Sequence, residues 1–293
     1  WRQILPHQPW LPPSTNGTIV FPGFDGAAEW GGAGFDPATG LLYVNANEMP
    51  WILRIIDRPQ PKQLDARALY LRNCASCHRP DLAGTPPEFP SLVNISAKLN
   101  TDELRNVVRS GAGRMPAFAD LSRPELQALI HYLASGANES ILAKDTSLSP
   151  QLPYSTDGYN KFLDAKKYPA VTPPWGTLSA VNLNKGTIEW QIPLGEYPEL
   201  AAKGQKDTGS ENYGGPVVTA GGLVFIAATN FDNKIRAFNK QSGKLVWEAM
   251  LPAGGNATPA VYSVNGKQYV VIACGGGKSG QPSGGKYVAF ALP

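Results

Sequence analysis

Two short sequence units alternate along this chain of 293 residues, and they limit its possible folds more than any other feature. The first unit occurs at 178–190 (LSAVNLNKGTIEW) and at 235–247 (IRAFNKQSGKLVW), with Ala, Asn, Gly and Trp at matching places and a constant offset of 57. The second unit occurs at 29–47, 212–230 and 257–276. Each unit reads as strand, glycine turn, strand. Their alternation predicts four-stranded repeats of roughly 50 residues, the spacing of β-propeller blades.

The pairing of these units predicts about three blades. They combine, in chain order, 29–47 with 178–190, 212–230 with 235–247, and 257–276 with 286–293. The last combination lacks an outermost strand. Propellers close with about four to eight blades, and an open end would expose strand edges. We therefore expect the C-terminal part of a larger propeller, with the remaining blades upstream or on another chain. The alternative fold is a β-sandwich with coincidental similarity between its strands.

Composition agrees with a turn-rich β-structure, because the chain has 31 Gly and 27 Pro. The net charge is only +3 and there is no run of Lys or Arg, so we expect no nucleic-acid partner. The longest apolar runs have the length of strands, which predicts no transmembrane segment. The chain begins with Trp rather than Met, and we interpret it as a processed product or a fragment.

A helical stretch separates the two halves of the first predicted blade. One helix is expected from about Leu64 into NCASCH, a second from a capping signal at Thr101 to Gly111, and a third from Ser122 to Gly136. Three short helices form a small core, which a metal or prosthetic group usually has to support. The predicted fold is mainly β with an α insertion. Its parts are a propeller segment (1–60), an inserted helical domain (61–138), a linker (139–174) and C-terminal blades (175–293).

The motif NCASCHRP lies at the end of the first predicted helix. Cys74 and Cys77 are spaced so that both thiols can add to the vinyl groups of haem, and His78 can then bind the iron. Met115 is the only Met of the helical stretch, and we expect it to be the second axial ligand. A redox dithiol would follow a strand, and a zinc site would need a second ligand pair where only His131 remains.

The helical stretch resembles a class I cytochrome c domain with a single haem. The motifs CASCH, FPSL (89–92), GRMPAF and ELQALIHYLASG follow one another in that family's order. The β parts resemble the quinoprotein glucose dehydrogenases, eight-bladed propellers that bind pyrroloquinoline quinone (PQQ). This second resemblance rests on the stretch from NYGGPVVTAGG to CGGGK and on EWGGAGFDPATGLLYVNANEMPW.

The quinoprotein resemblance implies that Asn45 contacts PQQ and that Tyr213 lies beside the quinone, with Trp30, Gly214 and Gly215 nearby. It also implies Ca²⁺, whose ligands belong mostly to blades outside this chain. The catalytic acid and base are expected on those blades too, so none is assigned here. The loop CGGGKSG has Gly277 where the family often has His, which leaves the substrate open. Cys274 lies in an apolar strand and is expected to be a buried structural thiol.

These features together predict part of a PQQ-dependent sugar or alcohol dehydrogenase. Electrons would pass from the quinone through haem c to an external acceptor such as a cytochrome or a copper protein. Haem attachment through C-x-x-C-H implies assembly in the periplasm or another extracytoplasmic place. The alternatives are an electron-transfer cytochrome with a propeller docking scaffold, and a binding propeller whose haem senses redox state.

Overall fold

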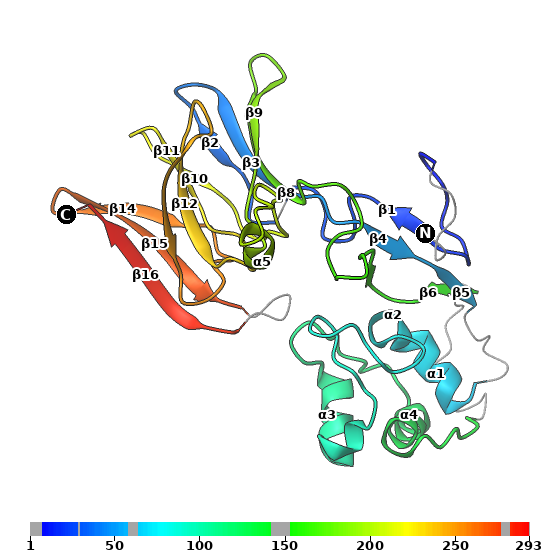
Figure 1. Ribbon diagram of the computed structural model, residues 1–293. Coiled ribbons are helices and arrows are strands. Elements are labelled where there is room, and N and C mark those ends of the chain that lie inside the picture. Colours follow the sequence, from blue (N-terminus) through cyan, green and yellow to red (C-terminus); the bar gives the residue numbers. More distant parts are fainter. Residues whose placement is uncertain (1–7, 29, 58–63, 142–152, 277–281, 293) are drawn as a thin grey trace. The chain divides into compact units, whose positions relative to one another are not determined.

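The computed structural model describes residues 8–28, 30–57, 64–141, 153–276 and 282–292 (Figure 1). The chain forms two compact units. The helical unit comprises Trp1–Ile19 and Ile52–Asn160, and the sheet unit comprises Val20–Trp51 and Lys161–Pro293. The chain passes from one unit to the other within three short strands, β1 (Thr18–Val20), β4 (Trp51–Leu53) and β7 (Asn160–Lys161).

The sheet unit consists of antiparallel sheets. The first has the order β2 (Gly34–Asp36), β3 (Leu41–Asn47), β8 (Gly176–Asn182), β9 (Thr187–Pro193). The second has the order β10 (Val217–Val218), β11 (Leu223–Ile226), β12 (Lys234–Asn239), β13 (Leu245–Met250), and the third β14 (Ala260–Val264), β15 (Lys267–Gly275), β16 (Gly285–Ala291). One short helix, α5 (Pro198–Ala201), follows β9. Pairing of β3 with β8 confirms that the helical stretch interrupts one sheet (Figure 1).

The repeated hairpins are equivalent in structure as well as in sequence. Ala180 pairs with Trp190, and Ala237 pairs with Trp247. In both hairpins the register shifts directly after the alanine. The glycine of each turn, at positions 186 and 243, has φ +68, a conformation that glycine adopts without strain. The offset of 57 therefore marks a real structural repeat.

The sheets pack on one another through apolar side chains. Leu178 of β8 forms a buried cluster with Ile226 and Phe238 of the second sheet. A separate cluster joins the second sheet to Ile272 and Cys274 of β15, and Cys274 is 2% exposed. This burial agrees with the expected structural thiol. The inner strand β8 is mostly buried, whereas the outer strand β9 is mostly exposed. Such a gradient is typical of blades, but the number of blades in a complete ring stays a prediction.

Lys240 connects the first two sheets at their turns. Its ammonium lies 2.8 Å from the Asp36 carboxylate. Its carbonyl accepts hydrogen bonds from the Tyr43 hydroxyl (3.0 Å) and from the Trp190 indole (3.2 Å). The hydrogen bond from Lys240, aided by one from Thr39, lowers the pKa of Asp36. Three side chains of the first sheet are thus held by one residue of the second.

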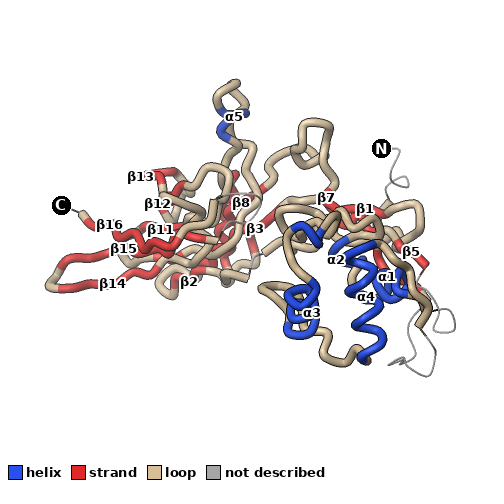
Figure 2. Tube along the Cα trace, turned by 90° about the horizontal axis from the view of Figure 1, so that it is seen from below, coloured by secondary structure: helices blue, strands red, loops and turns tan. Residues whose placement is uncertain are grey.

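The helical unit contains nearly all of the helices (Figure 2). They are α1 (Ala66–Asn73), α2 (Ala75–His78), the 3₁₀ helix η2 (Ile95–Ala97), α3 (Thr101–Ser110) and α4 (Arg123–Ser135). Strand β5 (Ile55–Asp57) pairs with β6 (Tyr154–Thr156). Two strands, β6 and β7, thus lie inside the segment 139–174 that was predicted as a linker, while 142–152 falls outside the described residues.

The helix ends follow the sequence signals with one correction. Ser122 caps α4 with Glu125, and Gly136 ends it at φ 76, as predicted. The N-cap of α3, however, is Asn100 and not Thr101. The Asn100 side chain accepts the backbone N–H groups of Asp102 and Glu103, both at 3.0 Å, and the Glu103 carboxylate accepts the Asn100 N–H. Asn is the better cap here because its carbonyl reaches both orphan donors.

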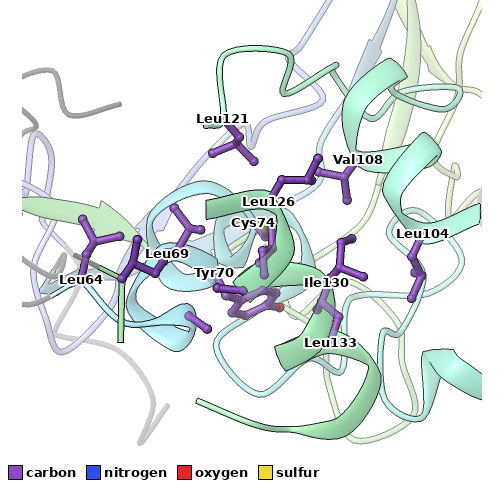
Figure 3. Packing of buried hydrophobic residues seen from close by; sticks show 14 of the residues in the cluster. Leu64, Leu69, Tyr70, Cys74, Leu104, Val108, Leu121, Leu126, Ile130 and Leu133 are labelled. Atoms are coloured by element: carbon purple, nitrogen blue, oxygen red, sulfur yellow. The ribbon is translucent and has the colours of Figure 1, made fainter. Parts of the chain in front are cut away.

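Figure 3 shows the core of the helical unit, where Leu69 and Tyr70 of α1 lie among Leu104 of α3 and Leu126 and Ile130 of α4. Both ends of this region are joined by backbone hydrogen bonds. The Ala66 N–H donates to the Glu139 carbonyl at 2.8 Å, and the Ile141 N–H donates to the Leu64 carbonyl at 3.0 Å. The chain therefore enters and leaves the helical core at one place. Among the described residues, no helix is long and apolar enough to cross a membrane.

Candidate functional site

The C-x-x-C-H motif occupies a single tight turn of the helical unit. Cys74 ends α1 and begins α2, and its carbonyl accepts the backbone N–H groups of Cys77 (3.1 Å) and His78 (2.9 Å). The two thiols and the imidazole therefore start from one rigid turn. A prosthetic group that binds all three needs this arrangement.

The His78 ring is fixed by the loop 89–92. Its Nδ1 atom lies 2.9 Å from the Pro90 carbonyl oxygen, and the side chain is almost fully buried. A carbonyl can only accept, so Nδ1 carries the proton and Nε2 keeps its lone pair. Such a bond fixes the tautomer and the ring orientation of a metal-binding histidine. The residues present fit haem iron at Nε2, and the FPSL motif contributes the bond.

The thiols bear on the three interpretations of the motif, which are haem attachment, a redox dithiol and a zinc site. All cysteines are free, and burial, with a smaller effect from Cys77, raises the pKa of Cys74 to about 12. Cys74 is thus a neutral thiol at neutral pH, whereas a redox dithiol needs a thiolate. No group of three or more His, Cys, Asp or Glu side chains within the described ranges could hold a metal ion. These observations speak against a redox dithiol and a zinc site, and thioether attachment of haem stays a prediction.

Met115, the predicted second axial ligand, lies in a small closed turn. Its N–H donates to the Ala112 carbonyl (2.9 Å), and its carbonyl accepts from the Ala112 N–H (3.1 Å). Its side chain is half-buried against the helical core. A side chain at Gly111 would come within 2.6 Å of the Met115 carbonyl, so the turn needs glycine there. The position of Met115 is well fixed, and its ligand role stays a prediction. His131, in contrast, pairs with Glu139 at the surface.

The predicted PQQ residues come together in the sheet unit. The Asn45 amide donates to the Gly214 carbonyl at 3.1 Å and to the Asn212 side chain at 2.8 Å. The backbone next to Trp30 lies so close to Gly214 and Gly215 that a Cβ at position 31 would be 2.0 Å from the Gly214 carbonyl carbon. Glycines are needed here because two backbones touch. Gly277, by contrast, lies outside the described residues.

Exposure separates these residues into two groups. Trp30 is 76% exposed, whereas Tyr213 is 1% and Asn45 is 0% exposed. The indole thus offers a face to a planar ligand, while the side chains of Asn45 and Tyr213 are buried. Asn45 Oδ1 is buried without a hydrogen-bond partner and could accept a donor or bind a cation. The residues fit PQQ by offering one exposed aromatic ring for stacking and one unsatisfied oxygen.

A buried polar network surrounds Tyr213, and sequence reasoning missed it. The Tyr213 hydroxyl lies 2.6 Å from Glu211 and 3.2 Å from Asp25. Lys161 pairs with Glu211 at 2.6 Å, and the Trp51 indole donates to Asp25 at 3.0 Å. Burial, together with the charges of Glu211 and Asp25, raises the pKa of Tyr213, which therefore stays protonated. Of the other network members, Glu211 adjoins NYGG and Trp51 ends the stretch EWGGAGFDPATGLLYVNANEMPW, whereas Asp25 and Lys161 lie far away in sequence and outside every recognised motif.

Comparison with known proteins relates the chain to one family. The family model described as "Glucose/ethanol/alcohol dehydrogenase, beta-propeller domain" matches residues 1–85 and 96–270. The chain is 32% identical over 291 residues to the quinoprotein glucose dehydrogenase of Escherichia coli (strain K12), covering 96% of this chain and 28% of that protein. It is 30% identical to quinoprotein glucose dehydrogenase A of Acinetobacter calcoaceticus, with 97% and 27% covered.

Among solved structures, quinohemoprotein alcohol dehydrogenase from Comamonas testosteroni matches with a TM-score of 0.45 and 18% identity, covering 94% of this chain and 27% of that one. The chain thus spans about a quarter of the length of the curated relatives that it matches.

Proposed function

The chain belongs to the PQQ-dependent glucose, ethanol and alcohol dehydrogenase family through its β-propeller domain, and on this basis we propose that it is part of a periplasmic sugar or alcohol dehydrogenase with its own haem c. When bound, PQQ would take two electrons from the substrate and a haem would carry them singly to an external cytochrome or copper protein. The remaining blades, the catalytic base and most Ca²⁺ ligands would lie outside this chain.

The bond between His78 and Pro90 carries the haem part of this proposal. It orients a buried imidazole with Nε2 free, directly after two free cysteines on the same turn. In this proposal Cys74 and Cys77 would attach the haem, and His78 and Met115 would supply the two protein ligands of its iron. A thioether opposite imidazole raises the potential and fills the sixth position, which suits electron transfer.

The wall of Trp30, Gly214 and Gly215 carries the PQQ part. The exposed indole would stack on the planar cofactor, with the two glycine backbones beside it. Asn45 would accept a hydrogen bond at Oδ1, and Tyr213 would hold the wall in place. Asn45 thus keeps the contact with PQQ that the resemblance implies, whereas Tyr213, which the resemblance puts beside the quinone, has a supporting role.

The test uses the full-length protein, reconstituted with PQQ and Ca²⁺ and mixed with a panel of aldoses, polyols and alcohols. The haem α band should appear on adding a substrate, and it should not appear without PQQ. A His131→Ala variant, changed at a surface histidine of the same unit, should behave like the parent protein, whereas His78→Ala should lose the spectrum of His–Met ligation. Absence of haem reduction with every substrate would overturn the dehydrogenase proposal.

A second candidate is an electron-transfer cytochrome that uses the sheets as a docking scaffold. The burial of Tyr213 favours it, because this side chain is only 1% exposed and offers no surface to a cofactor. In that case a small-molecule reductant would reduce the haem, but no substrate would do so with PQQ present. A propeller whose haem only senses redox state would show the same pattern and would in addition bind its ligand with a redox-dependent affinity.

A further inference from the structure

Arg79, the residue after the candidate axial histidine, has an unusual backbone. It lies at φ 64 and ψ 156, just after α2. This region is almost restricted to glycine, because a Cβ clashes with the neighbouring backbone there. An arginine persists in such a conformation only where its surroundings determine it.

Both the backbone and the side chain of Arg79 make polar contacts. Its backbone N–H donates to the Ala75 carbonyl at 2.8 Å, and its carbonyl accepts from the Tyr70 hydroxyl at 2.6 Å. Its guanidinium lies 2.7 Å from the Asn160 side-chain oxygen and 3.3 Å from Asp81. The contact to Asn160 joins the C-x-x-C-H turn to a residue that lies 81 positions later in the chain. A hydrogen bond to a charged group contributes more to stability than one between neutral groups.

Asn160 ends a short segment, residues 157–160, that we call the clasp. The Asn160 amide donates to Asp157 at 3.1 Å, and Asp157 pairs with Arg54 at 3.2 Å. Gly158 has φ +109, and a Cβ there would lie 3.0 Å from the Ser76 carbonyl in the middle of C-x-x-C-H. The clasp therefore lies directly on the turn, and glycine makes the close approach possible.

The clasp also contacts the loop that orients His78. Tyr159 stacks on Phe89 with ring centroids 5.1 Å apart and an interplanar angle of 21°. Phe89 precedes Pro90, whose carbonyl accepts the bond from His78. Residues 157–160 thus touch both elements that fix the imidazole. All of these residues belong to the helical unit.

We propose that Arg79 is a positioning residue whose strained backbone is stabilised by the hydrogen bond to Asn160, which we call the tie. Through this tie, the clasp holds the turn of His78 in the orientation in which the haem would receive electrons. This inference rests on the proposed function for its electron-transfer part. The contact of the clasp with the His78 turn involves protein groups only and does not depend on haem or PQQ. Arg79→Gly should relieve the strain but lose the tie, and Asn160→Ala should lose the tie and keep the strain.

The test compares these two variants with Asn94→Gly in the full-length protein. Asn94 also has positive φ (53), is exposed and lies in the same unit, so this control relieves strain without affecting the tie. Hydrogen exchange of the peptide containing 157–160 should speed up about tenfold or more in both tie variants, the size expected for one hydrogen bond to a charged group. Asn94→Gly should leave it unchanged. Melting should occur at a lower temperature in Asn160→Ala than in Arg79→Gly.

Electron delivery gives the second measurement. Substrate-driven haem reduction should slow about tenfold in both tie variants, a change equal to about 1.4 kcal/mol in a barrier. Reduction by dithionite and the haem potential should stay as in the parent. Combining the two substitutions should add little, because each removes the same tie. Unchanged exchange at the clasp would overturn the tie, and lost protection with an unchanged substrate-driven rate would overturn its role in electron delivery. A parent protein without haem would contradict the proposed function, while the exchange experiment would still test the tie.

Discussion

The ion pair between Arg72 of α1 and Glu125 of α4 should show a large cost when either charge is removed. The two groups lie 3.3 Å apart, with side chains 4% and 0% exposed. Glu125 also completes the cap of α4, because its second oxygen accepts the Ser122 N–H at 2.9 Å. Two guanidinium nitrogens of Arg72, Nε and Nη1, are buried without a hydrogen-bond partner. The pair therefore joins two helices at a high desolvation cost.

Breaking such a pair typically costs about 3–5 kcal/mol, because one charge stays buried without compensation. Glu125→Gln should lower the free energy of unfolding by about 3 kcal/mol, the lower end of this range, since glutamine can still cap the helix and its carbonyl can still accept from Arg72. Arg72→Met should be at the higher end. At about 4–8 °C for each kcal/mol in a small domain, either change lowers the melting temperature by about 12 °C or more. The double variant should recover most of the loss, because replacing both charges is often neutral.

The assay is hydrogen exchange of the α1 and α4 peptides together with thermal unfolding of the full chain. Arg105→Met is the matched control, since it removes the same group from the exposed ion pair with Asp102, whose side chains are 41% and 84% exposed. That pair should contribute about 1 kcal/mol or less. The reasoning would be refuted if Glu125→Gln lost no more stability than the control, or if the double variant were as unstable as the sum of the single ones.

Four further predictions concern the other sites. Cys77→Ser should leave haem attached through one thioether bond, which the pyridine haemochrome spectrum distinguishes from two. The hydrogen bond from Lys240 lowers the pKa of Asp36, so this carboxylate stabilises the fold above its ordinary value of 3.8 and loses that effect as the pH falls below it. The free energy of unfolding in urea should therefore differ between Asp36→Asn and the parent at about pH 6, and the difference should shrink as the pH falls below 3.8. Trp30→Ala should weaken PQQ binding in a fluorescence titration while stability changes by about 0.5 kcal/mol or less. Tyr213→Phe should cost about 1–3 kcal/mol in the free energy of unfolding, because it removes the hydroxyl that lies between the buried Glu211 and the partly buried Asp25. An unchanged unfolding midpoint would contradict this.

Features that depend on neighbouring residues could be read from the sequence. The hairpin turns at Gly186 and Gly243 follow from local backbone demands, and so does the end of α4 at Gly136. The pairing of β3 with β8 is long-range, yet it was predictable because the repeats show which strands belong to one sheet. The error at the start of α3 has a local cause, since Asn100 and Thr101 are both good caps and only their side-chain geometry decides between them.

Contacts between distant residues without a repeat could not be predicted. The network around Tyr213 joins Asp25, Lys161 and Glu211, whose local sequences carry no signal for one another. The tie between Arg79 and Asn160 has the same character. Buried polar pairs are chosen by geometry, and many arrangements with the same residue types would satisfy the same groups. The sequence motif therefore located the histidine turn, whereas its supporting contacts needed the structure.

The interrupted sheet poses a thermodynamic problem, and nested contacts reduce it. Strands β3 and β8 are joined by a connection of roughly 130 residues, and the entropy cost of closing a loop rises by about 0.6 kcal/mol with each doubling of its length. The pairing of Leu64–Ala66 with Glu139–Ile141 closes the innermost part, and β5 with β6 closes the next. With β5 and β6 paired, the open connection shrinks to roughly 25 residues, a little more than two halvings, which lowers the closure cost by about 1.4 kcal/mol. A folded insertion whose ends meet therefore lowers the entropy cost of pairing β3 with β8, compared with an unfolded insertion of equal length. The reason is that pairing within the insertion shortens the open connection between the two strands.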